Sequence, residues 1–223
     1  MKNGISMFYQ ILRKTYIRDY FRFTYILLFK VLFFSSCSKN NEVDPLKFKK
    51  MVSARNLGIA YLEEERYSDA VKEFEILTQI APEEPLGYAN LGLAYMRMNN
   101  KLIESEIWLK KAFEISPQNP DIRLLLAEFY QLNGNDDQAI RLLEKSLVSS
   151  PNHMQTLYEL ALLHSKIKNP NSIYKAEKYM KSLAEVLPSN LIVIFKLVEL
   201  LLQNQDYDGA LYYLETINQT LPE

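Results

Sequence analysis

The side chains that could carry out catalysis in this 223-residue chain are few and scattered. The single cysteine is Cys37, and neither of the two histidines, His153 and His164, lies near it in the sequence. A cysteine nucleophile needs a neighbouring base or positive charge that lowers the thiol pKa. One cysteine also cannot form an intramolecular disulfide or a thiolate metal cluster. We therefore expect no catalytic centre, no metal site and no cofactor.

The clustered carboxylates have a simpler explanation than acid–base chemistry. Glu63–Glu65 is expected to be a solvated helix end, and Asp136–Asp137 a helix start, where negative charge suits the helix dipole. His164 falls where other parts of the chain have a tyrosine, so we interpret it as structural. The six glycines are isolated and form no phosphate-binding loop.

Charge is distributed unevenly along the chain. Residues 1–36 contain six Lys or Arg and one Asp, a net charge of +5, whereas residues 37–223 contain 20 basic and 26 acidic side chains, a net charge of −6. A domain with net charge −6 would repel a phosphate backbone, so we expect no nucleic-acid partner. The content of 48% hydrophobic and 24% charged residues is that of a globular protein.

The excess positive charge precedes a short apolar segment. Phe23–Phe34 contains Lys30, and at about 1.5 Å per residue it is shorter than the roughly 30 Å hydrocarbon core of a bilayer. A basic start, a short apolar core and small residues at its exit are typical of a signal peptide. The alternative is a single-pass membrane anchor in which Lys30 extends to the interface.

The exit residues Phe34-Ser35-Ser36-Cys37 resemble the lipobox of bacterial lipoproteins. In that family a peptidase cuts before the cysteine, whose thiol carries diacylglycerol; the family prefers Leu where this chain has Phe34. The resemblance implies that residues 1–36 are removed and that Cys37 tethers the chain to a membrane of the cell envelope, facing the periplasm or the exterior. The alternative is a buried or incidental cysteine. Residues 37–50 are expected to form a polar tether.

A pattern with fixed spacing recurs from residue 51 onward. Five small residues are each followed 12 positions later by a proline; these pairs are Ala70 and Pro82, Ser105 and Pro117, Ala139 and Pro151, Ala176 and Pro188, and Ala210 and Pro222. Thirteen positions after each of the first four prolines stands a large residue: Tyr95, Tyr130, His164 and Leu201. Apolar residues at i, i+3, i+4 and i+7 around these positions predict pairs of helices joined by short turns.

This pattern resembles the tetratricopeptide repeat, a helix–turn–helix unit of about 34 residues. The resemblance divides residues 51–223 into five repeats, which are 51–84, 85–119, 120–153, 154–190 and 191–223. It implies an all-α, right-handed superhelical solenoid whose concave face is lined by the first helix of each repeat. We expect the extra residue of repeat two in the turn at Asn99-Asn100, and the three extra residues of repeat four in an enlarged turn at Asn169–Ser172.

The repeated residue types are explained by packing. Gly58 and Gly92 allow the neighbouring helix to approach closely, and Ala139 is expected where two helices touch. Each proline should end its helix pair, because it cannot donate the next backbone hydrogen bond. A single unit cannot bury its apolar faces, so the units must stack.

The resemblance also implies which side chains face the concave groove. These residues are Arg55, Asn56, Ile59, Leu62, Leu86, Asn90, Leu93, Met96, Leu125, Glu128, Gln131, Tyr158, Glu159, Leu162, Ile192, Phe195 and Lys196. The surface is largely apolar with a few charges, which suits an extended or helical peptide. Ile59, Asp121 and Leu125 replace residues of the carboxylate clamp of chaperone-binding members, so that clamp is not expected. The alternative is that the groove packs on the chain's own flanking segments.

We therefore predict a non-enzymatic, exported and lipid-anchored scaffold for a protein or peptide partner. The first alternative is the N-terminal repeat portion of a larger exported protein or enzyme, and the second is a membrane-anchored cytosolic scaffold. Repeat arrays need a polar-faced cap, yet the last predicted helix carries Leu211, Tyr212, Leu214 and Ile217. We expect this face to be covered by another subunit or a downstream domain, or the chain to be a fragment.

Overall fold

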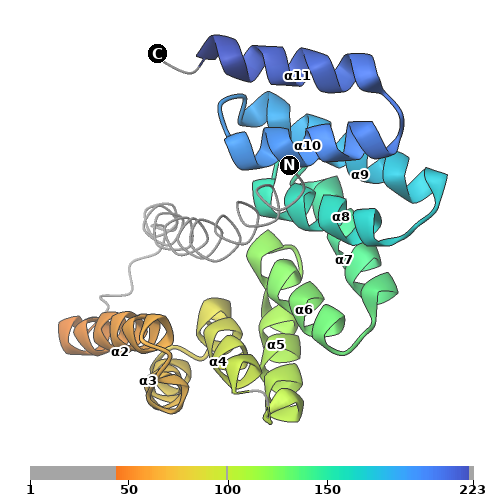
Figure 1. Cartoon of the computed structure of the whole chain (residues 1–223). Coiled ribbons are helices and arrows are strands. Elements are labelled where there is room, and N and C mark those ends of the chain that lie inside the picture. The colour runs from red at the N-terminus through yellow and green to blue at the C-terminus, as the bar shows by residue number, and fades with distance from the viewer. Residues whose placement is uncertain (1–43, 99, 221–223) are drawn as a thin grey trace.

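The computed structural model describes residues 44–98 and 100–220, and its side chains up to residue 216. All regular secondary structure in these ranges is α-helical, which confirms the predicted fold class (Figure 1). The helices are α2 (Pro45–Glu63), α3 (Tyr67–Ile80), α4 (Pro85–Arg97), α5 (Leu102–Ile115), α6 (Pro120–Leu132), α7 (Asp136–Ser149), α8 (Met154–Lys166), α9 (Pro170–Val186), α10 (Leu191–Gln203) and α11 (Tyr207–Thr220). Cys37 and the predicted signal segment lie outside the described residues.

The helices stack in chain order, and each packs against the helix before it and the helix after it. The pairs follow a curve from α2 to α11, so that the two ends of the stack lie far apart (Figure 1). The first helices of neighbouring repeats also contact one another, α2 with α4, α4 with α6, and α6 with α8. These contacts place the first helices on the inner side of the curve.

Local sequence signals determine where the helices begin. Pro85, Pro120 and Pro170 each occupy the first turn of a helix, where the missing backbone N–H would have no intrahelical partner. The side chain of Asn119 caps α6 by accepting from the backbone N–H groups of Asp121 and Ile122, at 2.9 and 3.2 Å. As predicted, α7 begins at Asp136.

The repeated prolines follow the second helices as predicted. Helices α3, α5, α7 and α9 each end two residues before a proline; these prolines are Pro82, Pro117, Pro151 and Pro188. Each intervening residue donates its backbone N–H to the last turn of its helix, for example Ala81 to the Leu77 carbonyl oxygen at 2.9 Å. The residue before a proline is biased away from helical geometry, so the helix stops there.

Two element boundaries differ from the sequence-based expectation. The three extra residues of repeat four lengthen α9 to 17 residues, against 14 in α7, and the turn before it is no longer than those of repeats three and five. Pro170 is favourable in the first helical turn, and the Asn169 side chain accepts from the Ser172 N–H at 2.8 Å. At the other end, α2 begins at Pro45, so exposed residues of the predicted tether are helical. Asp44 caps this helix by accepting from the Leu46 N–H.

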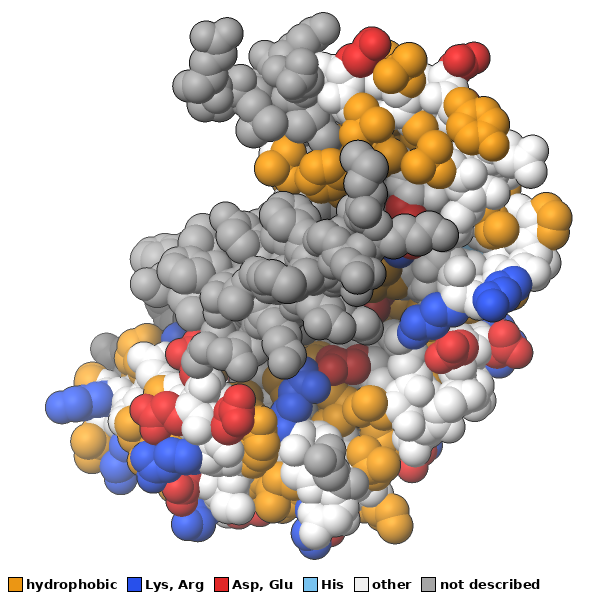
Figure 2. Space-filling model, in the orientation of Figure 1, with side chains coloured by type: hydrophobic (Ala, Val, Ile, Leu, Met, Phe, Trp, Pro, Cys, Tyr) orange, Lys and Arg blue, Asp and Glu red, His pale blue; other side chains and the backbone are white. Residues whose placement is uncertain are grey.

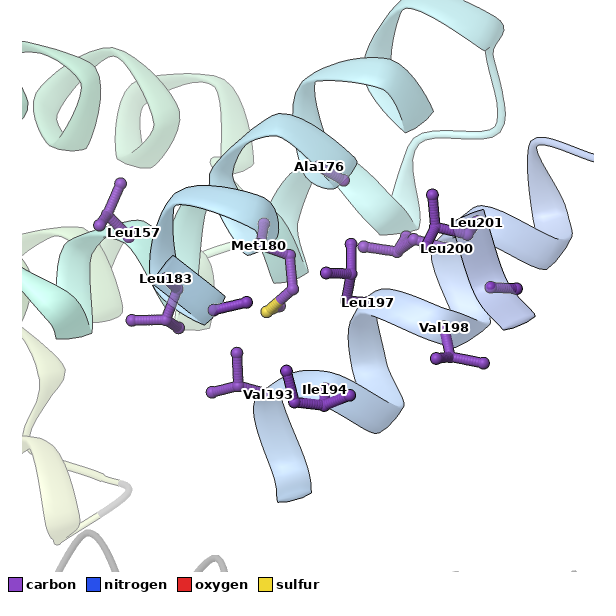
Figure 3. Close-up of a cluster of buried hydrophobic side chains, with 13 residues drawn as sticks. Leu157, Ala176, Met180, Leu183, Val193, Ile194, Leu197, Val198, Leu200 and Leu201 are labelled. Carbon is purple, nitrogen blue, oxygen red and sulfur yellow. The ribbon is translucent and has the colours of Figure 1, made fainter. Parts of the chain in front are cut away.

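The core runs along the stack as a chain of side-chain clusters between successive helices. Figure 3 shows one of them, in which side chains of α9 and α10 interdigitate. A β-carbon added to Gly58 would lie 2.5 Å from Phe74 Cε1, and one added to Gly92 would lie 2.7 Å from Leu109 Cγ. Both glycines are therefore required by close helix approach, as predicted, and Ala139 is fully buried in α7.

Candidate partner-binding groove

Every predicted groove residue lies on a first helix, and the first helices line the inner side of the curve. Helix α2 carries Arg55, Asn56, Ile59 and Leu62; α4 carries Leu86, Asn90, Leu93 and Met96; α6 carries Leu125, Glu128 and Gln131; α8 carries Tyr158, Glu159 and Leu162; α10 carries Ile192, Phe195 and Lys196. The fold thus gathers five segments of the sequence onto one side of the stack.

Met96 and Leu125 were expected to face the groove and are not exposed. Both side chains are buried in the core cluster that also contains Leu109 and Ile122. The inner faces of α4 and α6 are therefore narrower than the sets of positions assigned to them, because Met96 and Leu125 pack into the core between α4, α5 and α6. They contribute packing and offer no surface to a partner.

A pocket lies where α2, the end of α3 and the start of α4 meet. Its lining residues are Met51, Val52, Arg55, Leu77, Glu84, Leu86, Gly87 and Asn90. Three of the predicted groove residues, Arg55, Leu86 and Asn90, therefore come together here. Glu84 was not predicted, although its place before Pro85 at the N-cap of α4 was a usable signal.

The polar groups of this pocket are held in apolar surroundings. Burial lowers the pKa of the Arg55 guanidinium, and the negative charge of Glu84 partly opposes this effect. Asn90 is buried, and its Nδ2 atom has no hydrogen-bond partner in the described part of the chain. Leaving a buried donor unpaired costs about 1–3 kcal/mol. An acceptor atom from a ligand would remove this cost.

The middle of the inner face is acidic. Burial raises the pKa of the Glu159 carboxyl, and the nearby charge of Glu128 raises it further, while a hydrogen bond from Gln131 acts in the opposite direction. Glu128 is also 3.0 Å from the Arg97 guanidinium, measured from Oε1 to Nη1. Burial likewise raises the pKa of the Tyr158 phenol. Two carboxyl groups from α6 and α8 therefore share one region.

Helix α10 supplies the last part of the groove. Phe195 is exposed, and the Lys196 ammonium is 2.9 Å from Glu199 Oε2 on the same helix. The groove therefore changes in character along its length, from a pocket with a guanidinium and an amide, through a carboxyl pair, to an exposed aromatic ring.

The two histidines lie in structural environments. His153 contacts the Thr156 hydroxyl at 2.7 Å and the Asp121 carboxylate at 3.2 Å. His164 is buried against Tyr179, with ring centroids 5.9 Å apart, as its interpretation as a core residue requires. Within residues 44–98 and 100–220 no group of three His, Cys, Asp or Glu side chains could hold a metal ion. In the same ranges no helix has the length and apolar content needed to cross a bilayer.

Comparison with known proteins agrees with the repeat pattern. Two family models described as tetratricopeptide repeat match residues 55–120 and 109–163. Among solved structures, PilF of Pseudomonas aeruginosa is 15% identical with a TM-score of 0.66, covering 79% of each chain. MamA of Desulfovibrio magneticus RS-1 is 14% identical with a TM-score of 0.60, over 76% of this chain and 94% of that one.

A thermophilic TPR protein of Thermus thermophilus is 20% identical with a TM-score of 0.58, over 69% of this chain and 80% of that one. At these identities the structural matches establish the fold alone. Together with the helix pairs and the spacing of their glycines and prolines, they identify the described part of this chain as a tetratricopeptide-repeat solenoid.

Proposed function

We propose that this protein is a non-catalytic scaffold that binds a peptide segment of a protein partner in the groove of its first helices. Tetratricopeptide-repeat solenoids present extended concave surfaces of this kind. The groove of this chain combines apolar side chains with a few polar groups, the composition that suits an extended or helical peptide. The repeat family match supports interaction with proteins as the general role.

The observation that carries the proposal is the unpaired amide of Asn90. It is buried beside Arg55 in the pocket between α2, α3 and α4, where it lacks an acceptor among the described residues. A peptide carbonyl or side-chain oxygen would provide that acceptor. The same peptide, continuing along the groove, would then place a basic or amide side chain against Glu128 and Glu159, and an apolar one against Phe195.

The test is selection of peptides from a random display library on the purified full chain, followed by fluorescence anisotropy with the selected peptides. Asn90→Ala combined with Tyr158→Ala should weaken binding by about tenfold or more, since each removes a contact in a different repeat. The matched control is Val148→Ala, which alters an exposed apolar side chain of the second helix α7. Helical circular dichroism should be unchanged in both variants. Equal affinity of the double variant and the control would place the binding surface elsewhere.

We further propose that the scaffold is exported and held at a membrane through Cys37. The proposal is supported by the basic start, the short apolar core and the lipobox-like residues before the cysteine. Metabolic labelling with a fatty-acid probe should mark the wild-type chain and leave Cys37→Ala unmarked. Equal labelling of the two chains would refute lipid attachment at this residue.

A further inference from the structure

The last helix exposes a face that every earlier second helix buries. Four residues after the repeated small residue stand Phe74, Leu109, Leu143 and Met180, and all four are fully buried. The aligned residue of α11 is Leu214, which is 40% exposed. One residue after the small residue, Val71, Ile140 and Glu177 are buried and Glu106 is half-buried, whereas Leu211 of α11 is 54% exposed. Among the described residues, helix α11 therefore presents an apolar face without a partner helix.

The first helix has the complementary feature. Leu57 of α2 is 43% exposed, whereas the aligned leucines of the later first helices, Leu91, Leu126, Leu160 and Leu197, are at most 3% exposed. Those four leucines are buried because each packs on the second helix of the preceding repeat. Helix α2 follows no described second helix, so its leucine has no such partner in the described residues.

The two exposed faces are the two halves of one interface that occurs four times within the chain. Each aligned leucine shares a core cluster with the buried residue of the preceding second helix; the pairs are Phe74 with Leu91, Leu109 with Leu126, Leu143 with Leu160, and Met180 with Leu197. Figure 3 shows the last pair, with Met180 of α9 pointing toward Leu197 of α10. The same register would pair Leu214 of one chain with Leu57 of another.

The charges of the two end helices are also complementary. Helix α2 carries exposed Lys47, Lys49 and Lys50 in its first half, and α11 carries exposed Asp208 and Glu215 with no basic residue. Successive helices of the stack run in opposite directions, so the first half of an incoming α2 would lie along the second half of α11, where Glu215 is. Hydrophobic side chains gather over this C-terminal end of the molecule (Figure 2).

We propose that the occupant of the α11 face is α2 of a second copy of this chain, so that copies associate head to tail and continue the solenoid. The contact is heterologous, because the two copies use different surfaces. It therefore leaves one free α2 face and one free α11 face on each growing assembly, which extends until the ends meet or the concentration limits it.

The experiment uses sedimentation velocity of the full chain in mild detergent over a wide concentration range. Wild type should show an average mass that rises with concentration. Leu57→Glu and Leu214→Glu should each raise the apparent dissociation constant roughly tenfold or more, since each places a charge in an apolar contact. The two introduced carboxylates would repel each other wherever they meet. An equimolar mixture of the two variants should form dimers and nothing larger, because one intact α2 face and one intact α11 face remain to pair.

The matched control is Tyr212→Glu, on the same helix as Leu214. Its position is exposed in every second helix, as at Lys72, Ile107, Arg141 and Lys178, so this variant should associate like wild type. Three results would overturn the proposal: a wild-type chain that is monomeric throughout, association of Leu57→Glu equal to wild type, which indicates a symmetric α11 contact, or a variant mixture without dimers. Circular dichroism confirms that each variant is folded.

Discussion

Repeats one and two bring their paired helices together at a glycine, whereas repeat five has a valine at the aligned position. The series along the chain is Gly58, Gly92, Ala127, Ala161 and Val198. A β-carbon at Gly92 would lie 3.0 Å from the Leu109 backbone nitrogen, so the helices of repeat two meet at backbone distance. Val198 is buried in a core cluster of side chains from α8 to α11. The paired helices thus keep the same alignment in both repeats. In repeat two they meet at backbone distance, and in repeat five the Val198 side chain occupies the aligned position.

The large residue that stands 13 positions after each of the first four repeated prolines also differs between repeats, as Tyr95 and His164 show. In repeat two the Tyr95 hydroxyl reaches Glu75 Oε1 at 3.4 Å. In repeat four His164 is shorter, and its Nε2 atom lies 3.8 Å from Glu144 Oε1, beyond a direct hydrogen bond. Repeat two therefore gives its tyrosine hydroxyl a partner, whereas repeat four leaves its buried histidine poorly satisfied.

The largest expected effect comes from adding volume at the closest helix contact. Gly92→Val should lower the free energy of unfolding by about 3 kcal/mol, because Leu109 and its backbone cannot move away without separating α4 from α5. Val198→Ala, at the aligned position, should lose less, about 1–2 kcal/mol, since it only removes two buried carbon atoms. Urea unfolding followed by circular dichroism measures both. Equal losses would show that the two ends pack alike.

A smaller loss is expected in the middle of the stack. Ala139 is fully buried in α7 and packs in the cluster with Leu143 and Leu160. Ala139→Leu should therefore cost about 1–3 kcal/mol by overpacking. The control is Asp137→Ala at the exposed start of the same helix, which should cost roughly 1 kcal/mol or less by weakening the dipole interaction. Urea melts in which Ala139→Leu unfolds like wild type would contradict the helix-pair register.

The spacing of the small residues and the prolines was sufficient to predict most of the fold. Gly58, Gly92 and the prolines that follow the second helices have one physical role each, close approach or helix termination, so their positions translate directly into structure. The insertion in repeat four was misplaced because a proline such as Pro170 favours both a turn and the first helical turn. Whether such a proline lies in a turn or in the first turn of a helix depends on whether the residues after it can continue the helix.

The candidate groove was less predictable than the fold. A repeat alignment specifies which helix a residue belongs to, yet the width of the exposed face depends on how the next repeat packs. Met96 and Leu125 were assigned to the groove and are buried for this reason. The pocket that contains Arg55 and Asn90 also needs Leu77 and Glu84, which come from the second helix and the interhelical turn. Periodicity within the first helices cannot indicate such residues.

The difference between the tyrosine and histidine repeats predicts a pH effect. Burial lowers the pKa of His164, the positive charge of Lys175 lowers it further, and Glu144 opposes both. Because the folded pKa lies below the unfolded value of about 6.5, this residue favours folding above that pH, and its contribution is lost as the pH falls. His164→Leu should therefore reduce the loss of unfolding free energy between about pH 7 and pH 5.

The control for this prediction is Tyr130→Leu at the aligned position of repeat three, since a tyrosine does not titrate in this pH range. It should change the unfolding free energy by a similar amount at every pH. Chemical unfolding at several pH values measures both variants. A pH profile of His164→Leu parallel to that of wild type would show that another group controls the acid sensitivity.

The smallest effects are expected in the turns between paired helices, where repeats one, three and five share a left-handed residue. The φ angles are 62° at Glu65, 71° at Gly134 and 62° at Gln205. A residue with a β-carbon loses about 1–2 kcal/mol in this conformation, and glycine avoids that loss but gives the unfolded chain more entropy, worth about 0.4–1 kcal/mol. Gln205→Gly and Glu65→Gly should therefore stabilise the fold by about 0.5–1 kcal/mol. Gly134→Ala should destabilise it by a similar amount, because its β-carbon would meet no atom within 4 Å and only the backbone conformation is affected.

Glu65→Ala keeps the strained conformation and serves as the control for loss of the side chain. Thermal unfolding in parallel measures all four variants, and an equal shift for Glu65→Ala and Glu65→Gly would show that the side chain, and not the backbone angle, determines the stability of this turn.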